Sequence, residues 1–219
     1  MHVVIAGGHG KIGLRLGALL VGRGDTAVGL VRNPDHAADL ETAGVVPAVV
    51  DLEAVDAESL AGHLDGADAV VFAAGAGPGS GVGRKDSVDR AAAVLLADAA
   101  RLAGVRRYLL VSSAGVDDPP AEGTDEVWAA YLGAKKAAEE AVLAADLDAT
   151  VLRPGHLTDG PGTGKVRLAP PPVGGGEITR DDTAAALAAL LDAPGTAGLV
   201  LELREGETDL LEAVTGVAR

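Results

Sequence analysis

Four closely spaced glycines near the start of the chain are the first residues that point to chemistry. They follow a β-branched apolar run at 2–6 that has the length of a buried strand, and apolar residues at helical spacing come after them. The glycines are Gly7, Gly8, Gly10 and Gly13. This strand, turn and helix fit both glycine patterns that place a diphosphate against the free N–H groups of a helix N-terminus. The stretch predicts a dinucleotide site that includes Gly7, Gly10, Lys11 and Ile12.

A serine, a tyrosine and a lysine form the second set of reactive side chains. Ser113 stands at the carboxyl end of a strand expected over 106–112, and open α/β sheets bind ligands at that edge. Tyr131 and Lys135 lie four residues apart in a helix expected over 126–145, so their side chains share one helix face.

The elements that must position these residues alternate between strand and helix. Strands are expected at 2–6, 26–31, 45–50, 69–73, 106–112, 148–153 and 198–203. Helices are expected after Gly10, from Pro34, from about 54–56, at 86–103 and 126–145, after 178–182 to about 191, and at 209–214. Loops are expected at 75–83, 117–125, 159–165 and 170–176. The alternation predicts an α/β fold, a Rossmann-like doubly wound parallel sheet flanked by helices. We expect a single NAD(P)-binding domain over 1–219, in which 154–219 forms the small substrate-side part.

Residues at the ends of the next strands indicate which cofactor would bind. Arg32 follows the second strand, where an Arg accommodates the extra phosphate of NADP and an Asp or Glu favours NAD. NADP is therefore favoured, with Lys11 as a second possible cation and a solvated loop charge as the alternative reading of Arg32. After the third strand, beside Leu52, Asp51 would either bond the adenine amino group or cap the next helix. Small residues follow the fourth strand where a cofactor would pass: Ala73, Ala74 and Gly75.

Four motifs in order carry a family resemblance. They are the glycine turn, Val-Ser-Ser-Ala-Gly at 111–115, Tyr-Leu-Gly-Ala-Lys at 131–135 and Leu-Arg-Pro-Gly-His at 152–156. With them the chain resembles the short-chain dehydrogenase/reductases, and more narrowly their atypical, NmrA-like NAD(P)H-binding branch. The resemblance runs nearly from end to end.

This resemblance implies that Ser113, Tyr131 and Lys135 form a catalytic set. Tyr131 would donate or remove a proton, Lys135 would lower the pKa of Tyr131 and hold the nicotinamide ribose, and Ser113 would orient a substrate carbonyl. A nearby cation favours the phenolate, which would move the pKa of Tyr131 from about 10 toward the working pH. Pro154 and His156 would lie near the nicotinamide, with His156 reaching the substrate or the carboxamide.

The expected function is an NADP-dependent oxidoreductase that passes a hydride between nicotinamide and a small carbonyl or quinone-like substrate. The main alternative is a non-catalytic NADP(H)-binding redox sensor or regulatory protein. A Ser113/Asp117/His156 hydrolase fits the chain order but little else, because Val111 stands where a nucleophile elbow needs its first glycine. The substrate and the oligomeric state stay open at this point.

Composition excludes several other classes. The net charge of −14 opposes a phosphate backbone, so nucleic acid is not an expected partner. The chain has no cysteine, and its five histidines show no metal-binding spacing, so no metal site is expected. With no apolar span of membrane length and no signal-like start, we expect a cytoplasmic protein without membrane contact.

Overall fold

The structure, a computed structural model, describes residues 1–77, 79–118 and 123–218. Within them, nine strands form one sheet in the order β11-β8-β10-β6-β5-β4-β1-β2-β3. They are β1 (His2–Ala6), β2 (Thr26–Val31), β3 (Val46–Val49), β4 (Ala69–Phe72), β5 (Arg107–Val111), β6 (Asp148–Pro154), β8 (Lys165–Ala169), β10 (Val200–Glu205) and β11 (Thr208–Asp209). Neighbours from β10 to β3 pair in parallel, whereas β8 pairs antiparallel with both β10 and β11. A separate parallel pair joins β7 (His156–Thr158) and β9 (Glu177–Thr179).

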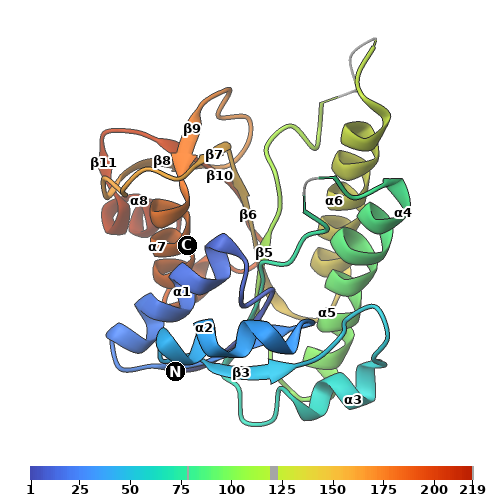
Figure 1. Ribbon diagram of the computed structural model, residues 1–219. Helices are drawn as coiled ribbons and strands as arrows, with labels where there is room; N and C mark the ends of the chain where they lie inside the picture. Colours follow the sequence, from blue (N-terminus) through green and yellow to red (C-terminus); the bar gives the residue numbers. More distant parts are fainter. Residues whose placement is uncertain (78, 119–122, 219) are drawn as a thin grey trace.

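Helices cover both faces of the sheet (Figure 1). One face carries α1 (Lys11–Gly22), α2 (Ala37–Thr42), α7 (Arg180–Leu191) and α8 (Leu210–Val217). The other carries α3 (Ala57–Gly62), α5 (Ala92–Leu102) and α6 (Glu126–Ala144). The short helix α4 (Val82–Arg84) continues through a π-helical segment, η2 (Lys85–Ala91), into α5, and two 3-10 turns are η1 (Pro34–His36) and η3 (Pro194–Thr196). Helices on both faces of a parallel sheet confirm the predicted doubly wound Rossmann-like fold.

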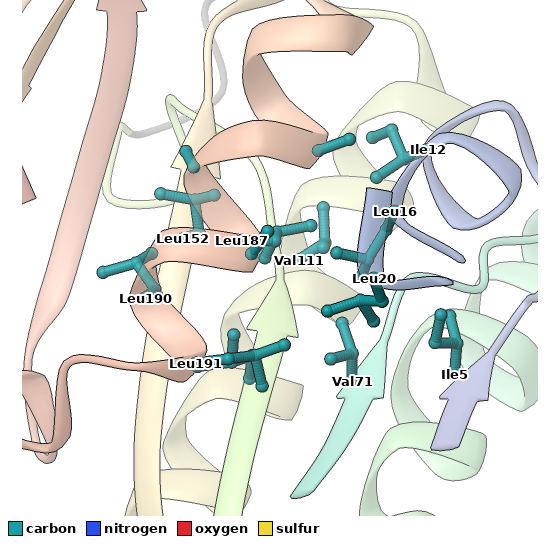
Figure 2. Packing of buried hydrophobic residues seen from close by; sticks show 14 of the residues in the cluster. Ile5, Ile12, Leu16, Leu20, Val71, Val111, Leu152, Leu187, Leu190 and Leu191 are labelled. Carbon is teal, nitrogen blue, oxygen red and sulfur yellow. The ribbon is translucent and has the colours of Figure 1, made fainter. Parts of the chain in front are cut away.

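Each central strand is buried on both sides, which explains its near-continuous apolar sequence. In β1, Val3 and Ile5 join the core under α1 and α7, while Val4 and Ala6 join the core under α5 and α6. Figure 2 shows the first of these cores, where side chains of α1 and α7 meet residues of the central strands. The core thus holds the carboxyl ends of β1, β4 and β5 at one edge.

The structure corrects two predictions of loops. The segment 159–165 gives its last residue to β8, and the alternation of exposed Lys165 and Arg167 with buried Val166 and Leu168 is a strand pattern that sequence reasoning missed. Predicted loop 75–83 ends inside α4, so the helical run before α5 begins earlier than expected at 86. Of the predicted loop 117–125, residues 119–122 lie outside the part of the chain that the structure describes.

No helix within the described residues combines the length and the apolar character needed to cross a bilayer.

Candidate active site

The glycine turn between β1 and α1 has geometry that only glycine allows. Gly7 has φ +81°, and a Cβ there would lie 2.7 Å from the Cα of Ala74. A Cβ on Gly13 would lie 2.3 Å from the carbonyl oxygen of Gly7, so α1 packs directly against the turn. Gly10 is the N-cap of α1 and no described side chain caps that end, which leaves first-turn N–H groups available to an acceptor. This cradle fits a diphosphate group.

A cavity of about 390 Å³, named the Arg32 cavity, opens beside the glycine turn where the strand order reverses at β1. Ligands bind open α/β sheets at such a switch point. Eight predicted cofactor residues line it: Gly7, Gly10, Arg32, Asp51, Leu52, Ala73, Ala74 and Gly75. Residues far apart in the chain therefore meet in one cavity, as the sequence predicts.

Arg84, a residue that sequence reasoning missed, lines this cavity together with Arg32. Both guanidinium groups bind one oxygen of Glu53, at 3.0 Å from Arg32 and 2.7 Å from Arg84. A hydrogen bond from Ser87, followed by the charge of Arg84, holds the pKa of Glu53 below its usual range. Two cations thus converge on one carboxylate, that of Glu53, which follows β3.

The structure tests one of the two predicted roles of Asp51, the role of helix cap. Asp56, not Asp51, is the N-cap of α3, because its side chain accepts the Ser59 N–H at 2.8 Å. Asp51 instead accepts the Glu53 N–H at 3.0 Å within the turn after β3. The helix-cap prediction is wrong, and a role toward adenine stays a prediction for a residue that lines the Arg32 cavity.

Lys11 lies at the start of α1 but turns away from the Arg32 cavity. Its Nζ donates to Asp159 at 2.6 Å, and Arg15 and Arg180 pair with the same carboxylate. The predicted second cation near Arg32 is therefore absent from the lining of that cavity among the described residues, and Arg84 stands there instead.

A second cavity of about 670 Å³, named the Tyr131 cavity, shares Ala73, Ala74 and Gly75 with the first. Ser113 enters it from the end of β5, and Tyr131 and Lys135 enter it from α6. Ile12 and His156 also line it. The three candidate catalytic residues therefore lie together at the edge of the sheet where the glycine turn lies.

The environment of Tyr131 contradicts one expectation. Burial raises the pKa of Tyr131 to about 12, the contact with Ser113 opposes this rise, and the charge of Asp89 adds to it. The prediction that Lys135 moves this pKa toward neutrality is wrong, because the phenol is largely buried and Asp89 balances the lysine charge. Tyr131 keeps its proton at neutral pH.

Asp89 is a further site residue that the sequence did not single out. Its Oδ1 lies 3.4 Å from the Nζ of Lys135, and the two side chains are 1% and 5% exposed. Oδ1 accepts no hydrogen bond from the described residues, while Oδ2 accepts the Ala76 N–H at 3.2 Å. Lys135 also donates to the Val111 carbonyl at 3.1 Å, and burial lowers the pKa of its ammonium.

The π-helical segment η2 explains how Asp89 reaches the cavity. π-Bulges shift the helix register and recur at functional sites. Here Arg84, just before η2, and Val88 line the Arg32 cavity, whereas Lys85 and Asp89 line the Tyr131 cavity. The helix that apolar spacing predicts from residue 86 does not indicate this division between the two cavities. The signal that could have indicated it is the pair of charged residues, Lys85 and Asp89, beside an alanine-rich helical run.

Comparison with known proteins decides the family. The sequence profile described as NAD(P)H-binding matches residues 7–194. The chain belongs to this NAD(P)H-binding family. A Bacillus subtilis (strain 168) relative named as the uncharacterized sugar epimerase YhfK is 34% identical over 215 residues, which cover 98% of this chain and 99% of the relative.

Solved structures of similar proteins agree with this assignment. A Bacillus halodurans protein, named provisionally as an NAD-dependent epimerase/dehydratase, is 32% identical with a TM-score of 0.91, and 99% of each chain is covered. The anaerobillin reductase ChuY from Escherichia coli O157:H7 is 28% identical with a TM-score of 0.77, over 95% of this chain and 99% of that one. The chain is thus part of an oxidoreductase and epimerase-like group, and the resemblance to atypical short-chain dehydrogenase/reductases is confirmed.

The two residues expected near the nicotinamide occupy different positions in this NAD(P)H-binding fold. His156 is exposed and lines the Tyr131 cavity. Pro154 is buried at the end of β6, where its carbonyl accepts the Ala114 N–H at 3.1 Å, and it lines none of the cavities described above. Its place beside the nicotinamide therefore stays a prediction, and Gly155 and Leu157 line the cavity at this point instead.

Proposed function

We propose that this chain is an NADPH-dependent reductase of a small carbonyl or quinone-like substrate. The observation that carries the proposal is the meeting of Ser113, Tyr131 and Lys135 in a cavity that continues from the glycine-turn crevice. When bound, NADPH supplies the hydride. The remaining tasks fall to the side chains of the Tyr131 cavity.

Tyr131 is suited to donate the proton that balances hydride transfer. Its phenol is protonated at neutral pH, since its pKa is about 12. As the carbonyl carbon gains a hydride, the carbonyl oxygen takes the phenolic proton, and solvent then restores the proton to Tyr131. Ser113, in contact with the phenol, orients the same oxygen.

Lys135 is suited to hold the ribose and to stabilise the transient phenolate. Its Nζ lies 5.8 Å from the centroid of the Tyr131 ring. Asp89 and the Val111 carbonyl fix it in place. Asp89 therefore acts as a positioning residue for Lys135.

We infer a preference for NADPH over NADH from the Arg32 cavity. The two guanidinium groups that converge on Glu53 offer a bidentate site for the additional phosphate of NADP. Arg84 supplies the second cation. A preference for NADH in titrations with both cofactors would reject this assignment.

The proposal is tested by NADPH oxidation against a panel of ketones, aldehydes and quinones. Tyr131→Phe should keep NADPH binding and lose roughly 100-fold or more of turnover. Tyr108→Phe is the matched control, because Tyr108 is fully buried and bonds the Ala93 carbonyl outside the cavity.

Other outcomes of this test identify other functions. NADPH binding without turnover of any acceptor would favour the redox-sensor alternative. Turnover that interconverts sugar epimers without net NADPH consumption would favour an epimerase, the activity in the name of the Bacillus subtilis relative.

A further inference from the structure

Lys85 places a buried ammonium group in the Tyr131 cavity. Lys85 is 8% exposed, and its Nζ donates to the Gly77 carbonyl at 3.0 Å. The same Nζ lies 5.3 Å from the centroid of the Tyr131 ring. Lys85 therefore stands next to the group that we propose as the proton donor, although the proposed reaction assigns it no task.

The other charged groups of this cavity are already paired. Lys135 pairs with Asp89, and Arg180 pairs with Asp159 at 3.0 Å. The remaining carboxylate in the lining, Asp125, is the N-cap of α6.

Among the described residues, no carboxylate lies within ion-pairing distance of the Lys85 Nζ. A buried charge without a counter-ion is costly, so an unpaired cation in a ligand cavity indicates that the ligand carries the counter-charge.

An aromatic wall lies on the same side of the cavity. Trp128 stacks on Tyr131 with ring centroids 5.2 Å apart and an angle of 29° between planes. Trp128 is 50% exposed and lines the cavity, so its ring is free to contact a ligand. A flat unsaturated group packs well against such a surface.

We propose that the Tyr131 cavity binds substrates that carry a carboxylate on a flat, unsaturated skeleton, and that Lys85 binds this carboxylate. This inference names the substrate class of the proposed reductase, and its statement about turnover rests on that proposed function. Binding of the carboxylate does not depend on it, because that binding is measurable without NADPH. The charge-assisted hydrogen bond from Lys85 would set the orientation of the substrate beside Tyr131.

Trp128 is the only tryptophan of the chain and reports directly on this cavity. Benzoate and the uncharged benzamide are titrated into the full chain while Trp128 fluorescence is followed, with and without saturating NADP⁺. Benzoate should bind roughly 10-fold or more tightly than benzamide. Lys85→Met should remove this advantage and Lys85→Arg should retain most of it. The matched control is Lys165→Met, an equal loss of charge at an exposed position of β8.

Three results would overturn the inference. They are equal binding of benzoate and benzamide by the unaltered chain, a benzoate advantage that survives in a folded Lys85→Met variant, and competitive loss of benzoate binding with NADP⁺, which would assign Lys85 to the cofactor. Thermal unfolding of each variant separates loss of the site from loss of the fold, and Lys85→Gln replaces Lys85→Met if the latter does not fold. Benzoate binding by a chain that never oxidises NADPH would leave this site standing and reject the reductase.

Discussion

The buried pair of Lys135 and Asp89 allows the sharpest structural test of the site. The two charged atoms lie 3.4 Å apart, and their side chains are 5% and 1% exposed. Removing one partner of a buried pair leaves an uncompensated charge, which costs roughly 3–5 kcal/mol. That is a large part of the roughly 5–15 kcal/mol that stabilises a typical domain. Lys135→Met should therefore destabilise the chain by roughly 3–5 kcal/mol.

The second change, Asp89→Asn, removes the stranded charge and keeps an oxygen for the Ala76 N–H. Lys135→Met combined with Asp89→Asn should consequently be more stable than Lys135→Met alone, with a coupling of roughly 1–3 kcal/mol. Urea unfolding at neutral pH, followed by far-ultraviolet circular dichroism, gives the four free energies of the cycle.

An exposed pair on the same helical run supplies the control. Arg90 and Asp86 are 40% and 60% exposed, so a cycle on them should give a coupling of only about 0.3–0.5 kcal/mol. Effects of the Lys135 and Asp89 changes that add within about 0.5 kcal/mol would refute the reasoning, because they would mean that the two side chains do not interact energetically.

Three further measurements test other parts of the site. Tyr131 should stay protonated in the native chain until the pH approaches its pKa of about 12, as followed by phenolate absorbance with the other tyrosine changed to Phe. Because the pKa of Tyr131 is higher in the folded chain than in the unfolded chain, the protonated phenol contributes about 2–3 kcal/mol to the free energy of unfolding. This contribution is complete below pH 10, the unfolded pKa, and is lost as the pH rises to about 12. Ionisation of Tyr131 near pH 10 in the native chain would contradict this. Arg32→Ser and Arg84→Ser should each weaken NADPH binding by roughly 10-fold in calorimetry and leave NADH binding nearly unchanged, and equal losses for both cofactors would argue against a phosphate site. Gly13→Ala should weaken NADPH binding and lower the melting temperature, since its Cβ would lie 2.3 Å from a carbonyl oxygen, whereas Gly22→Ala in the same helix meets nothing within 4 Å and should be neutral or stabilising.

Local patterns were enough to predict most of the sheet. The second strand is found at its predicted residues, Thr26–Val31, and the helix over 126–145 differs from α6 by one residue at its end. Both depend on apolar spacing and on nearby turn signals, which act over a few residues. Strand β8 was missed because two glycine-rich segments flank it and mask its short alternation.

The sequence predicted the three candidate catalytic residues, but it did not predict the charged residues around them or the pKa of Tyr131. Ser113, Tyr131 and Lys135 were found because each belongs to a recognisable motif. Asp89 and Lys85 carry no motif, and only the register of the π-helical segment turns them toward Tyr131. The pKa of Tyr131 depends on burial and on Asp89 together, so the role of Lys135 that the family resemblance implies gave the wrong direction.

The central claim is that a reduced nicotinamide dinucleotide lies along the two cavities, with its nicotinamide beside Tyr131. Energy transfer from Trp128 to NADPH tests it most directly, because this single tryptophan lines the Tyr131 cavity and its emission overlaps NADPH absorption. The account predicts saturable quenching of Trp128 fluorescence with matching sensitised NADPH emission. Competing NADP⁺ should reverse the quenching and the sensitised emission, and Trp128→Phe should abolish the sensitised emission. Quenching that rises linearly with NADPH, without sensitised emission or competition by NADP⁺, would contradict it.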